Sequence, residues 1–327
     1  MHYLVTGGAG FIGSHLADAL VRRGETVTLF DDLSTGSKDN IRHLIEHPRV
    51  TWVQGSVLDA ASVMELVEEA DAVVHLAASV GVRLIMEKPL ESFLNNIRGT
   101  ENVLGASARF GRRVLVTSTS EIYGKNGDGA LREDSDRILG SPFIARWSYS
   151  TSKAVDEILA YRYHAERGLP AIVARLFNCV GPRQTGHYGM VVPRFVRQAL
   201  RGEDVTVYGE GTQRRCFCHV QDAVRALILL LGCDEAAGGV FNIGGTEEVT
   251  IGELAEHVVR LTGSSSRIVR IPYEEAFPEG FEDMERRLPD NGRIRALTKW
   301  EPTKHLDEIL LDVIEYERMP MATRVSS

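Results

Sequence analysis

Cysteine is scarce in this sequence, which has four such residues in a chain of 327: Cys179, Cys216, Cys218 and Cys233. So few cysteines cannot hold a chain of this length together as a disulfide scaffold. A single residue separates Cys216 from Cys218, and that spacing does not suit zinc ligands. We therefore predict reduced, structural cysteines and no metal site.

Long apolar runs and an excess of positive charge are also missing. No apolar run approaches the roughly 20 residues that a membrane span needs, and the N-terminus does not resemble a secretory signal. The 37 Lys and Arg residues are outnumbered by 45 Asp and Glu residues, for a net charge of -8. This balance argues against general binding to nucleic acid, which requires cations to neutralise phosphates. We expect a cytoplasmic protein with no membrane span and no nucleic-acid partner.

Hydrophobic residues make up 43% of the chain, and in its first half they form short runs that alternate with amphipathic stretches. Such alternation is typical of an α/β fold, here a doubly wound parallel sheet of the Rossmann type. The predicted helices lie near 11–23, 60–69, 90–110 and 147–167. The predicted strands are 2–6, 26–30, 51–54, 72–76, 113–118 and 171–176.

The pattern of residues changes after residue 177, where Gly, Pro and Arg are frequent in the segment NCVGPRQTGHYGM. We predict a cofactor-binding domain over 1–177 and a smaller substrate-binding domain over 178–327. Two helix-like segments of the second part, 220–232 and 250–262, are apolar enough to pack on another element. The strand-like segment 240–245 is able to return to the sheet of the first domain.

A glycine-rich segment, TGGAGFIG (6–13), follows the first predicted strand and opens the first helix. Gly7 permits a tight turn, Gly10 lets the backbone approach a pyrophosphate, and Gly13 allows close packing of helix on strand. The start of the helix, with Phe11 and Ile12, offers N–H groups to phosphates. This pattern predicts a dinucleotide site.

Two aspartates are candidates to bind the adenosine part of the dinucleotide. Asp31, at the end of the second strand, can accept hydrogen bonds from both ribose hydroxyls and would repel a 2′-phosphate. We therefore predict NAD, and not NADP, as the cofactor. Asp59 is placed to bind the adenine amino group, and it is equally suited to cap the helix over 60–69.

Tyr149 and Lys153 form Y-S-T-S-K within a helical pattern, and a spacing of four puts both side chains on one helix face. A lysine ammonium about 5 Å from a phenol, at an effective dielectric constant of about 20, lowers the pKa of the tyrosine by about two units. Thr119 ends the strand 113–118, and ligands of doubly wound sheets bind beyond the carboxyl ends of the strands. We predict that Thr119, Tyr149 and Lys153 form a catalytic group.

These residues together resemble the extended short-chain dehydrogenase/reductase family, in its nucleotide-sugar epimerase, dehydratase and decarboxylase branch. The resemblance covers nearly the whole chain in the order of the family's motifs. Those motifs are TGGAGFIG, LFDDLSTG, HLAAS (75–79), NIRGT (96–100), STSEIYG, YSTSK, ARLFNCVGPR (174–183), VTVYGEGTQRRCF (205–217) and RRLPD (286–290).

The resemblance implies a nucleotide-sugar substrate, with a UDP-sugar favoured, and further site residues. It implies that Asn96 lies by the active-site helix and that Asn178, Arg215 and Arg287 contact the nucleotide diphosphate. Arginine forks suit this role because they bind phosphate oxygens in pairs. It also assigns Leu76, Ala77 and Ala78 to the cofactor site and Val192 and Tyr208 to the substrate site.

The three residues Thr119-Ser120-Glu121 separate the branches of the family. Dehydratases carry Thr-Asp-Glu there, whereas Thr-Ser-Glu resembles the UDP-glucuronate decarboxylases, in which oxidation at C4 produces a β-keto acid that loses carbon dioxide. In that chemistry Ser120 and Glu121 would organise the carboxyl group and the return of a proton to C5. A glutamate beside a carboxylate substrate requires either a protonated Glu121 or a repulsion that raises the ground state.

One departure keeps a UDP-sugar 4-epimerase as the alternative. The decarboxylases carry an aromatic residue after the fourth strand, but the loop here reads SVGVRLIMEKP (79–89). Arg83 in this loop is placed either to pair with a substrate carboxylate or to form a surface or dimer salt bridge. A 4,6-dehydratase and a non-catalytic NAD-binding sensor are weaker interpretations.

The resemblance also predicts a homodimer. The helices over 90–110 and 147–167 are similar to the pair that meets its copy across a two-fold axis in this family. The residues predicted to face outward are Leu94, Val103, Ile158, Leu159 and Tyr163.

Overall fold

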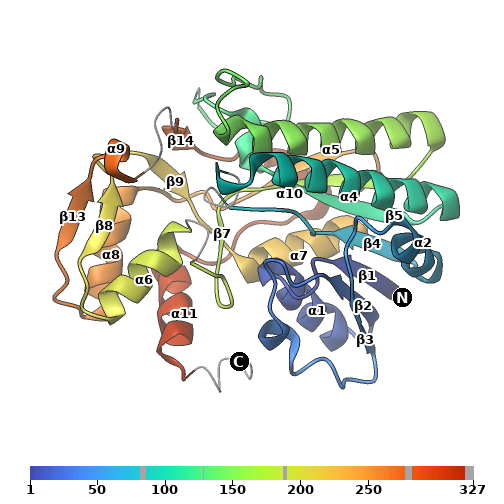
Figure 1. Ribbon diagram of the computed structural model, residues 1–327, viewed down its shortest axis with the longest axis horizontal. Coiled ribbons are helices and arrows are strands. Elements are labelled where there is room, and N and C mark those ends of the chain that lie inside the picture. Colours follow the sequence, from blue (N-terminus) through green and yellow to red (C-terminus); the bar gives the residue numbers. More distant parts are fainter. Residues whose placement is uncertain (82–85, 128, 187–189, 277–281, 321–327) are drawn as a thin grey trace.

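The computed structural model describes residues 1–81, 86–127, 129–186, 190–276 and 282–320. A seven-stranded parallel sheet forms its centre, in the order β11-β6-β5-β4-β1-β2-β3 (Figure 1). Its strands are β1 (His2–Thr6), β2 (Thr26–Asp31), β3 (Val50–Gln54), β4 (Ala72–His75), β5 (Arg113–Thr119), β6 (Ala171–Leu176) and β11 (Val240–Ile243). The predicted Rossmann-type fold is confirmed.

Helices cover both faces of the sheet because successive strand residues point to opposite sides. Leu4 and Val73 pack with α2, α4 and α5 on one face, whereas Val5 and Val74 pack with α1, α7 and α10 on the other. The helices are α1 (Phe11–Arg22), α2 (Ala60–Glu69), α4 (Pro89–Phe110), α5 (Arg146–Arg167), α7 (Val220–Leu231) and α10 (Gly292–Thr298). A strand buried on both faces reads as a continuous apolar run, as the sequence shows.

A second, smaller core lies beside the sheet (left in Figure 1). It is formed by apolar residues of α6 (Val191–Leu200), α8 (Ile251–Thr262) and α11 (Leu306–Arg318) around β8 (Val205–Tyr208). Short elements complete the chain: β7 (Cys179–Val180), β9 (Arg214–Cys216), β10 (Cys218–His219), β12 (Glu248–Thr250), β13 (Ile268–Ile271), α9 (Tyr273–Ala276), β14 (Arg286–Arg287), η1 (Lys38–Ile41), η2 (Ser120–Tyr123) and η3 (Asp234–Ala236).

The chain crosses between the two cores more than once. Strand β11 pairs in parallel with β6, at the edge of the sheet, so this segment joins the sheet of the first core. Helix α7 also packs against the sheet side, while α8 belongs to the second core. The two cores therefore do not divide at a single point in the sequence. The first core also contains segments that follow residue 178, namely α7, β11 and α10.

Among the residues that the structure describes, no helix is both long and apolar enough to cross a membrane.

Candidate active site

A cavity of about 380 Å³ opens at the carboxyl ends of the sheet strands and runs towards the second core. Ligand sites of doubly wound sheets lie at this edge. Most of the residues predicted for the cofactor and the chemistry line it: Gly7, Gly10, Phe11, Ile12, Gly13, Asp31, Leu76, Ala77, Ala78, Asn96, Thr119, Ser120, Glu121, Tyr149, Lys153, Asn178 and Arg287.

The glycine loop has the close packing that its sequence predicts. Gly7 has φ +70°, a conformation that side chains disfavour. A Cβ atom at Gly13 would lie 2.2 Å from the carbonyl oxygen of Gly7, so only glycine fits there. Gly10 is the N-cap of α1 and supplies no capping side chain. The first turn of α1 is therefore suited to receive a pyrophosphate on its backbone N–H groups.

Asp31, the last residue of β2, lines the cavity beside the glycine loop. Its buried carboxylate accepts hydrogen bonds from the backbone N–H groups of Ala9, at 3.0 Å, and Leu33, at 2.8 Å. Burial raises the pKa of Asp31, and these two hydrogen bonds oppose that shift. An acidic side chain fixed at this edge disfavours a 2′-phosphate nearby, as expected for an NAD site.

Asp59 caps helix α2. Its carboxylate accepts hydrogen bonds from the backbone N–H of Ala61 and from the Ser62 hydroxyl, at 3.1 and 2.6 Å, and these lower its pKa. The neighbouring Leu58, and not Asp59, lines the cavity. The capping role is thus present, while an adenine contact by Asp59 stays a prediction.

Tyr149 and Lys153 lie one turn apart on α5, and Thr119 ends β5 opposite them; all three line the cavity. The Lys153 ammonium, however, is 2.9 Å from the carboxylate of Asp156. Burial raises the pKa of Tyr149, and Glu121 and Asp156 raise it further, against a hydrogen bond with Thr119 and the charge of Arg146. The predicted lowering of the Tyr149 pKa is therefore wrong for this arrangement.

Asn96 joins the loop after β4 to helix α5. Its side-chain oxygen accepts a hydrogen bond from the backbone N–H of Ser79, at 2.7 Å, and its amide nitrogen donates to the Ser152 hydroxyl, at 3.3 Å. Asn96 therefore lies beside α5, and its contact with a bound cofactor stays a prediction. Asn96 thereby fixes the edge of the cavity next to Tyr149.

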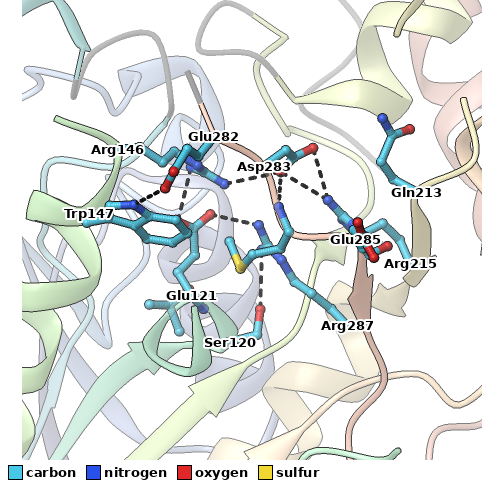
Figure 2. Close-up of polar contacts among 12 residues, drawn as sticks. Ser120, Glu121, Arg146, Trp147, Gln213, Arg215, Glu282, Asp283, Glu285 and Arg287 are labelled. Carbon is cyan, nitrogen blue, oxygen red and sulfur yellow. Dashed lines mark hydrogen bonds and ion pairs between the residues drawn. The ribbon is translucent and has the colours of Figure 1, made fainter. Parts of the chain in front are cut away.

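Glu121 forms ion pairs with two arginines at the end of the cavity away from the glycine loop (Figure 2). Its carboxylate oxygens lie 3.0 Å from Arg146 and 3.1 Å from Arg287. Arg287 also donates a hydrogen bond to the Ser120 hydroxyl, at 3.4 Å. Ser120, Glu121 and Arg287 therefore meet, although 166 residues separate Glu121 from Arg287 in the chain.

An outer carboxylate extends this group of charges. Asp283 lies 3.2 Å from Arg215 and 3.7 Å from Arg146 (Figure 2). We call Glu121, Arg146, Arg215, Asp283 and Arg287 the arginine cluster. Its three guanidinium groups face two carboxylates, so the cluster is net positive and attracts an anionic group that enters the cavity.

Strand register explains why two arginines meet here. Strand β14 pairs in parallel with β9, with Arg287 opposite Arg215 and Arg286 opposite Arg214. Alternate strand residues point to opposite faces. Arg286 accordingly binds Glu248 on the outer face, with 2.6 Å between nitrogen and oxygen, while Arg215 and Arg287 point into the cluster.

The arginine cluster keeps Glu121 ionised. Burial alone would raise the pKa of Glu121, but Arg146 and then Arg287 outweigh burial and hold the pKa below its usual value. Of the two alternatives that the sequence left open, a protonated Glu121 is thus disfavoured. A carboxylate substrate would meet a second negative charge at this end of the cavity.

Comparison with known proteins agrees with this geometry. Residues 3–244 match the model of the NAD dependent epimerase/dehydratase family. The chain belongs to this family. It is 42% identical to a UDP-N-acetyl-alpha-D-glucosaminuronate decarboxylase of Bacillus cytotoxicus, over 96% of this chain and 97% of the relative. It is 39% identical to UDP-glucuronic acid decarboxylase 6 of Arabidopsis thaliana, over 94% of this chain and 86% of the relative.

A solved structure of this family resembles the fold over almost its full length. The UDP-glucuronic acid 4-epimerase from Bacillus cereus, in complex with UDP-glucuronic acid and NAD, superposes with a TM-score of 0.87 at 29% identity and covers 97% of this chain and 98% of that one. The predicted family and the predicted cofactor, NAD, are confirmed. The glycine loop and Asp31 are the residues of this chain that would hold the NAD phosphates and ribose.

Three residues predicted from the family for the substrate site do not line the cavity. Val192 is buried in the second core, and the Arg194 guanidinium lies over the Tyr208 ring, 4.1 Å from its centre. Arg215 is paired with Arg287 across strands β9 and β14 and binds Asp283. Arg83 lies outside the described residues. Substrate contacts by these four residues stay predictions.

Sequence reasoning missed Arg146 and Asp283. Arg146 precedes Tyr149 by three residues, and such a spacing places both on one helix face, so helical periodicity could have revealed it. Asp283 lies in an irregular segment before β14 and has no periodic signal. Only the tertiary arrangement reveals its role.

Proposed function

We propose that this enzyme is an NAD-dependent decarboxylase of a UDP-hexuronate, with UDP-glucuronate as the first substrate to test. The observation that carries the proposal is the position of Glu121 between Arg146 and Arg287, with Ser120 beside Arg287, at the sugar end of the cavity. Decarboxylases named for UDP-glucuronic acid and for an acetamido hexuronate are the similar relatives that support it.

The reaction begins with oxidation at C4 of the sugar. Tyr149 accepts the proton of the 4-hydroxyl, which Thr119 holds in place. When bound, NAD supplies the acceptor for the hydride that leaves C4. The resulting ketone is β to the carboxylate, so it can accept the electron pair of the breaking C5–C6 bond as an enolate while carbon dioxide departs.

The arginine cluster around Glu121 suits the later steps of the reaction, which are the loss of carbon dioxide and the return of a proton. Its net positive charge attracts the substrate, while Glu121 stands between Arg146 and Arg287 and competes with the substrate carboxylate for both. Because the substrate carboxylate then faces a negative charge, loss of neutral carbon dioxide relieves a repulsion. The enolate then takes a proton from water at C5, where Ser120 and Glu121 are placed to orient that water, and the product is a 4-keto pentose. Return of the hydride to C4 would give UDP-xylose.

A UDP-sugar 4-epimerase is the second candidate function. The similarity to the UDP-glucuronic acid 4-epimerase structure favours it, as does the loop 79–89, which lacks the aromatic residue of the decarboxylases. Both candidates share the oxidation at C4 and the use of Thr119, Tyr149 and Lys153. They differ in whether carbon dioxide is lost.

The deciding experiment compares wild type with Glu121→Gln in a paired assay of carbon dioxide and NADH on UDP-glucuronate. We expect wild type to release carbon dioxide and the variant to lose this release while it still forms some NADH, because oxidation depends on Tyr149 and Thr119. Glu282→Gln is the matched control, since Glu282 pairs with Lys125 and Trp147 outside the cavity. We expect this control to decarboxylate normally.

A second substrate, UDP-N-acetylglucosaminuronate, is assayed in parallel because the relative from Bacillus cytotoxicus is named for it. If wild type releases carbon dioxide from neither hexuronate but forms the C4 epimer, the epimerase takes the place of the decarboxylase.

The homodimer and the cytoplasmic location are retained as part of this proposal. Ile158 and Tyr161 of α5 are 58% and 53% exposed, and Leu90 of α4 is 70% exposed, which supports a shared face on these helices. Val103, predicted to face outward, instead lies in the core of its own subunit, because its side of α4 packs on the sheet. Sedimentation that shows a monomer at micromolar concentration would contradict the dimer.

A further inference from the structure

Asp156 is a buried carboxylate that the proposed reaction does not use. It has no exposed surface, and its Oδ2 atom lies 2.9 Å from the Nζ atom of Lys153. Its Oδ1 atom has no hydrogen-bond partner among the described residues. A charge buried so completely is costly unless it is paired, so Lys153 is the group that stabilises it.

Helical spacing explains how Asp156 reaches this place. Tyr149, Lys153 and Asp156 stand at positions i, i+4 and i+7 of α5, which form a single stripe on the helix. Tyr149 and Lys153 line the cavity, and Asp156 is absent from its lining. The carboxylate is therefore behind Lys153, seen from the cavity, and not in contact with a ligand there.

The adjacent residue provides a contrast. Glu157 is also buried, but it binds Arg175 with two hydrogen bonds of 2.9 and 2.7 Å, away from the catalytic group. Asp156 and Glu157 are therefore neighbouring acids of one helix that neutralise different cations. Only Asp156 neutralises the lysine that assists Tyr149.

We propose that Asp156 is a positioning residue, whose carboxylate anchors the Lys153 ammonium beneath the cavity and offsets part of the positive charge that assists proton transfer to Tyr149. Lys153 then acts as one half of an ion pair and not as an isolated charge. This proposal rests on the oxidation step of the proposed function and is independent of the later loss of carbon dioxide.

The other charged groups around Tyr149 come from several elements. Lys153, Arg146 and Asp156 belong to α5, Glu121 to η2 beside Thr119, and Arg287 to β14. His75 of β4 also senses Lys153, but burial first and then this ammonium lower the pKa of His75 to about 3, so His75 is neutral at physiological pH. Among the described residues, Glu121 and then Asp156 are the carboxylates that oppose ionisation of Tyr149 most strongly.

The first test is the pH dependence of NADH formation with UDP-glucuronate in the NAD-loaded enzyme. Removal of the negative charge in Asp156→Asn favours the phenolate form of Tyr149. The rise of the NADH-formation rate with pH, which is the acid limb of the profile, should therefore occur about one pH unit or more lower than in wild type. Asp156→Glu keeps the charge and should restore a limb near that of wild type. Glu157→Gln is the matched control and should leave the limb in place.

Tyrosinate absorbance gives an independent reading of the same effect. The signal that disappears in Tyr149→Phe should titrate at lower pH in Asp156→Asn than in wild type. If Asp156→Asn folds and oxidises the substrate, but the acid limb of its NADH-formation profile stays in place or moves to higher pH, the proposal is overturned. Absence of carbon dioxide from every hexuronate would instead count against the decarboxylase, since oxidation alone reports on Asp156.

A stability cycle covers the case in which Asp156→Asn does not fold. Lys153→Met leaves the buried Asp156 carboxylate without its cation, and it should lower the melting temperature at neutral pH. Lys153→Met combined with Asp156→Asn removes both charges and should melt at a higher temperature than Lys153→Met alone. If the double variant melts at a lower temperature than Lys153→Met, the two residues are not coupled. This result would overturn the proposal that Lys153 and Asp156 stabilise each other as an ion pair.

Discussion

Following the proposed function, we call the part of the cavity beside the glycine loop its cofactor half and the part beside Glu121 its sugar half, and the two are built in different ways. The cofactor half is largely backbone. A Cβ atom would lie 2.8 Å from the Ala77 nitrogen at Gly7, and 3.0 and 2.2 Å from the Gly7 carbonyl oxygen at Gly10 and Gly13. The sugar half is a cluster of charged side chains from η2, α5, β9, β14 and the segment before β14 (Figure 2). A backbone site tolerates little change in shape, whereas an ion cluster responds to pH and to single charges.

Tyr149 stands where the two halves meet, and its replacement should have the largest effect. Tyr149→Phe removes only the oxygen that accepts the proton, so turnover should fall by about 1,000-fold or more while NAD still binds. Steady-state rates and NAD titration measure both quantities. Tyr161→Phe, on the exposed side of the same helix, is the control. Near-normal turnover of Tyr149→Phe would remove this residue from the mechanism.

Gly13→Ala tests the rigidity of the cofactor half. The new Cβ atom would lie 2.2 Å from the Gly7 carbonyl oxygen, so the loop must shift, and NAD affinity should fall by about 10- to 100-fold. Gly127→Ala is the control because nothing lies within 4 Å of a Cβ atom there. Calorimetric titration with NAD makes the comparison. Equal affinities in the two variants would contradict a pyrophosphate site shaped by close packing.

Arg146→Met tests the electrostatic character of the sugar half. Arg146 helps to hold the pKa of Glu121 below its usual value, so carbon dioxide release is present above that pKa and lost as the pH falls through it. Removal of the guanidinium raises the pKa of Glu121, so carbon dioxide release should be lost at a higher pH than in wild type. At the pH where the wild-type rate begins to fall, the variant should be about 10-fold slower.

The pH profile of carbon dioxide release, measured beside that of NADH formation, separates this effect from a general loss of activity. Arg162→Met, at an exposed arginine of the same helix, should reproduce the wild-type profile. An Arg146→Met profile that keeps the wild-type acid limb would contradict the role of Arg146 in the cluster.

Asp31→Asn should have a modest effect, comparable in size with that of Arg146→Met. An asparagine oxygen can still accept one of the hydrogen bonds from Ala9 and Leu33, so the loop should keep its shape. Loss of the charge should weaken NAD binding by about 10-fold and narrow the preference over NADP. Parallel titrations with the two cofactors measure this ratio. A wild-type protein that binds both equally would refute the assignment of Asp31.

The sequence by itself determined the sheet, the dinucleotide loop and the catalytic stripe of α5. Each depends on neighbours in the chain: apolar runs define strands, glycines are required where backbone segments touch, and a spacing of four aligns Tyr149 with Lys153. The same local reasoning failed at Val103, whose orientation depends on how α4 lies on the sheet, and at the pKa of Tyr149.

Only the tertiary structure decided which charges meet. Arg287 reaches Glu121 because β14 aligns with β9, and Asp283 reaches Arg215 from an irregular segment. Asp156 could be placed on the Lys153 face from its spacing, but its complete burial depends on how α5 packs against its neighbours in the fold. Electrostatic interactions depend on distance and solvent exposure, and both are set by segments remote in sequence, so a motif can name a catalytic residue without revealing the charges that control it.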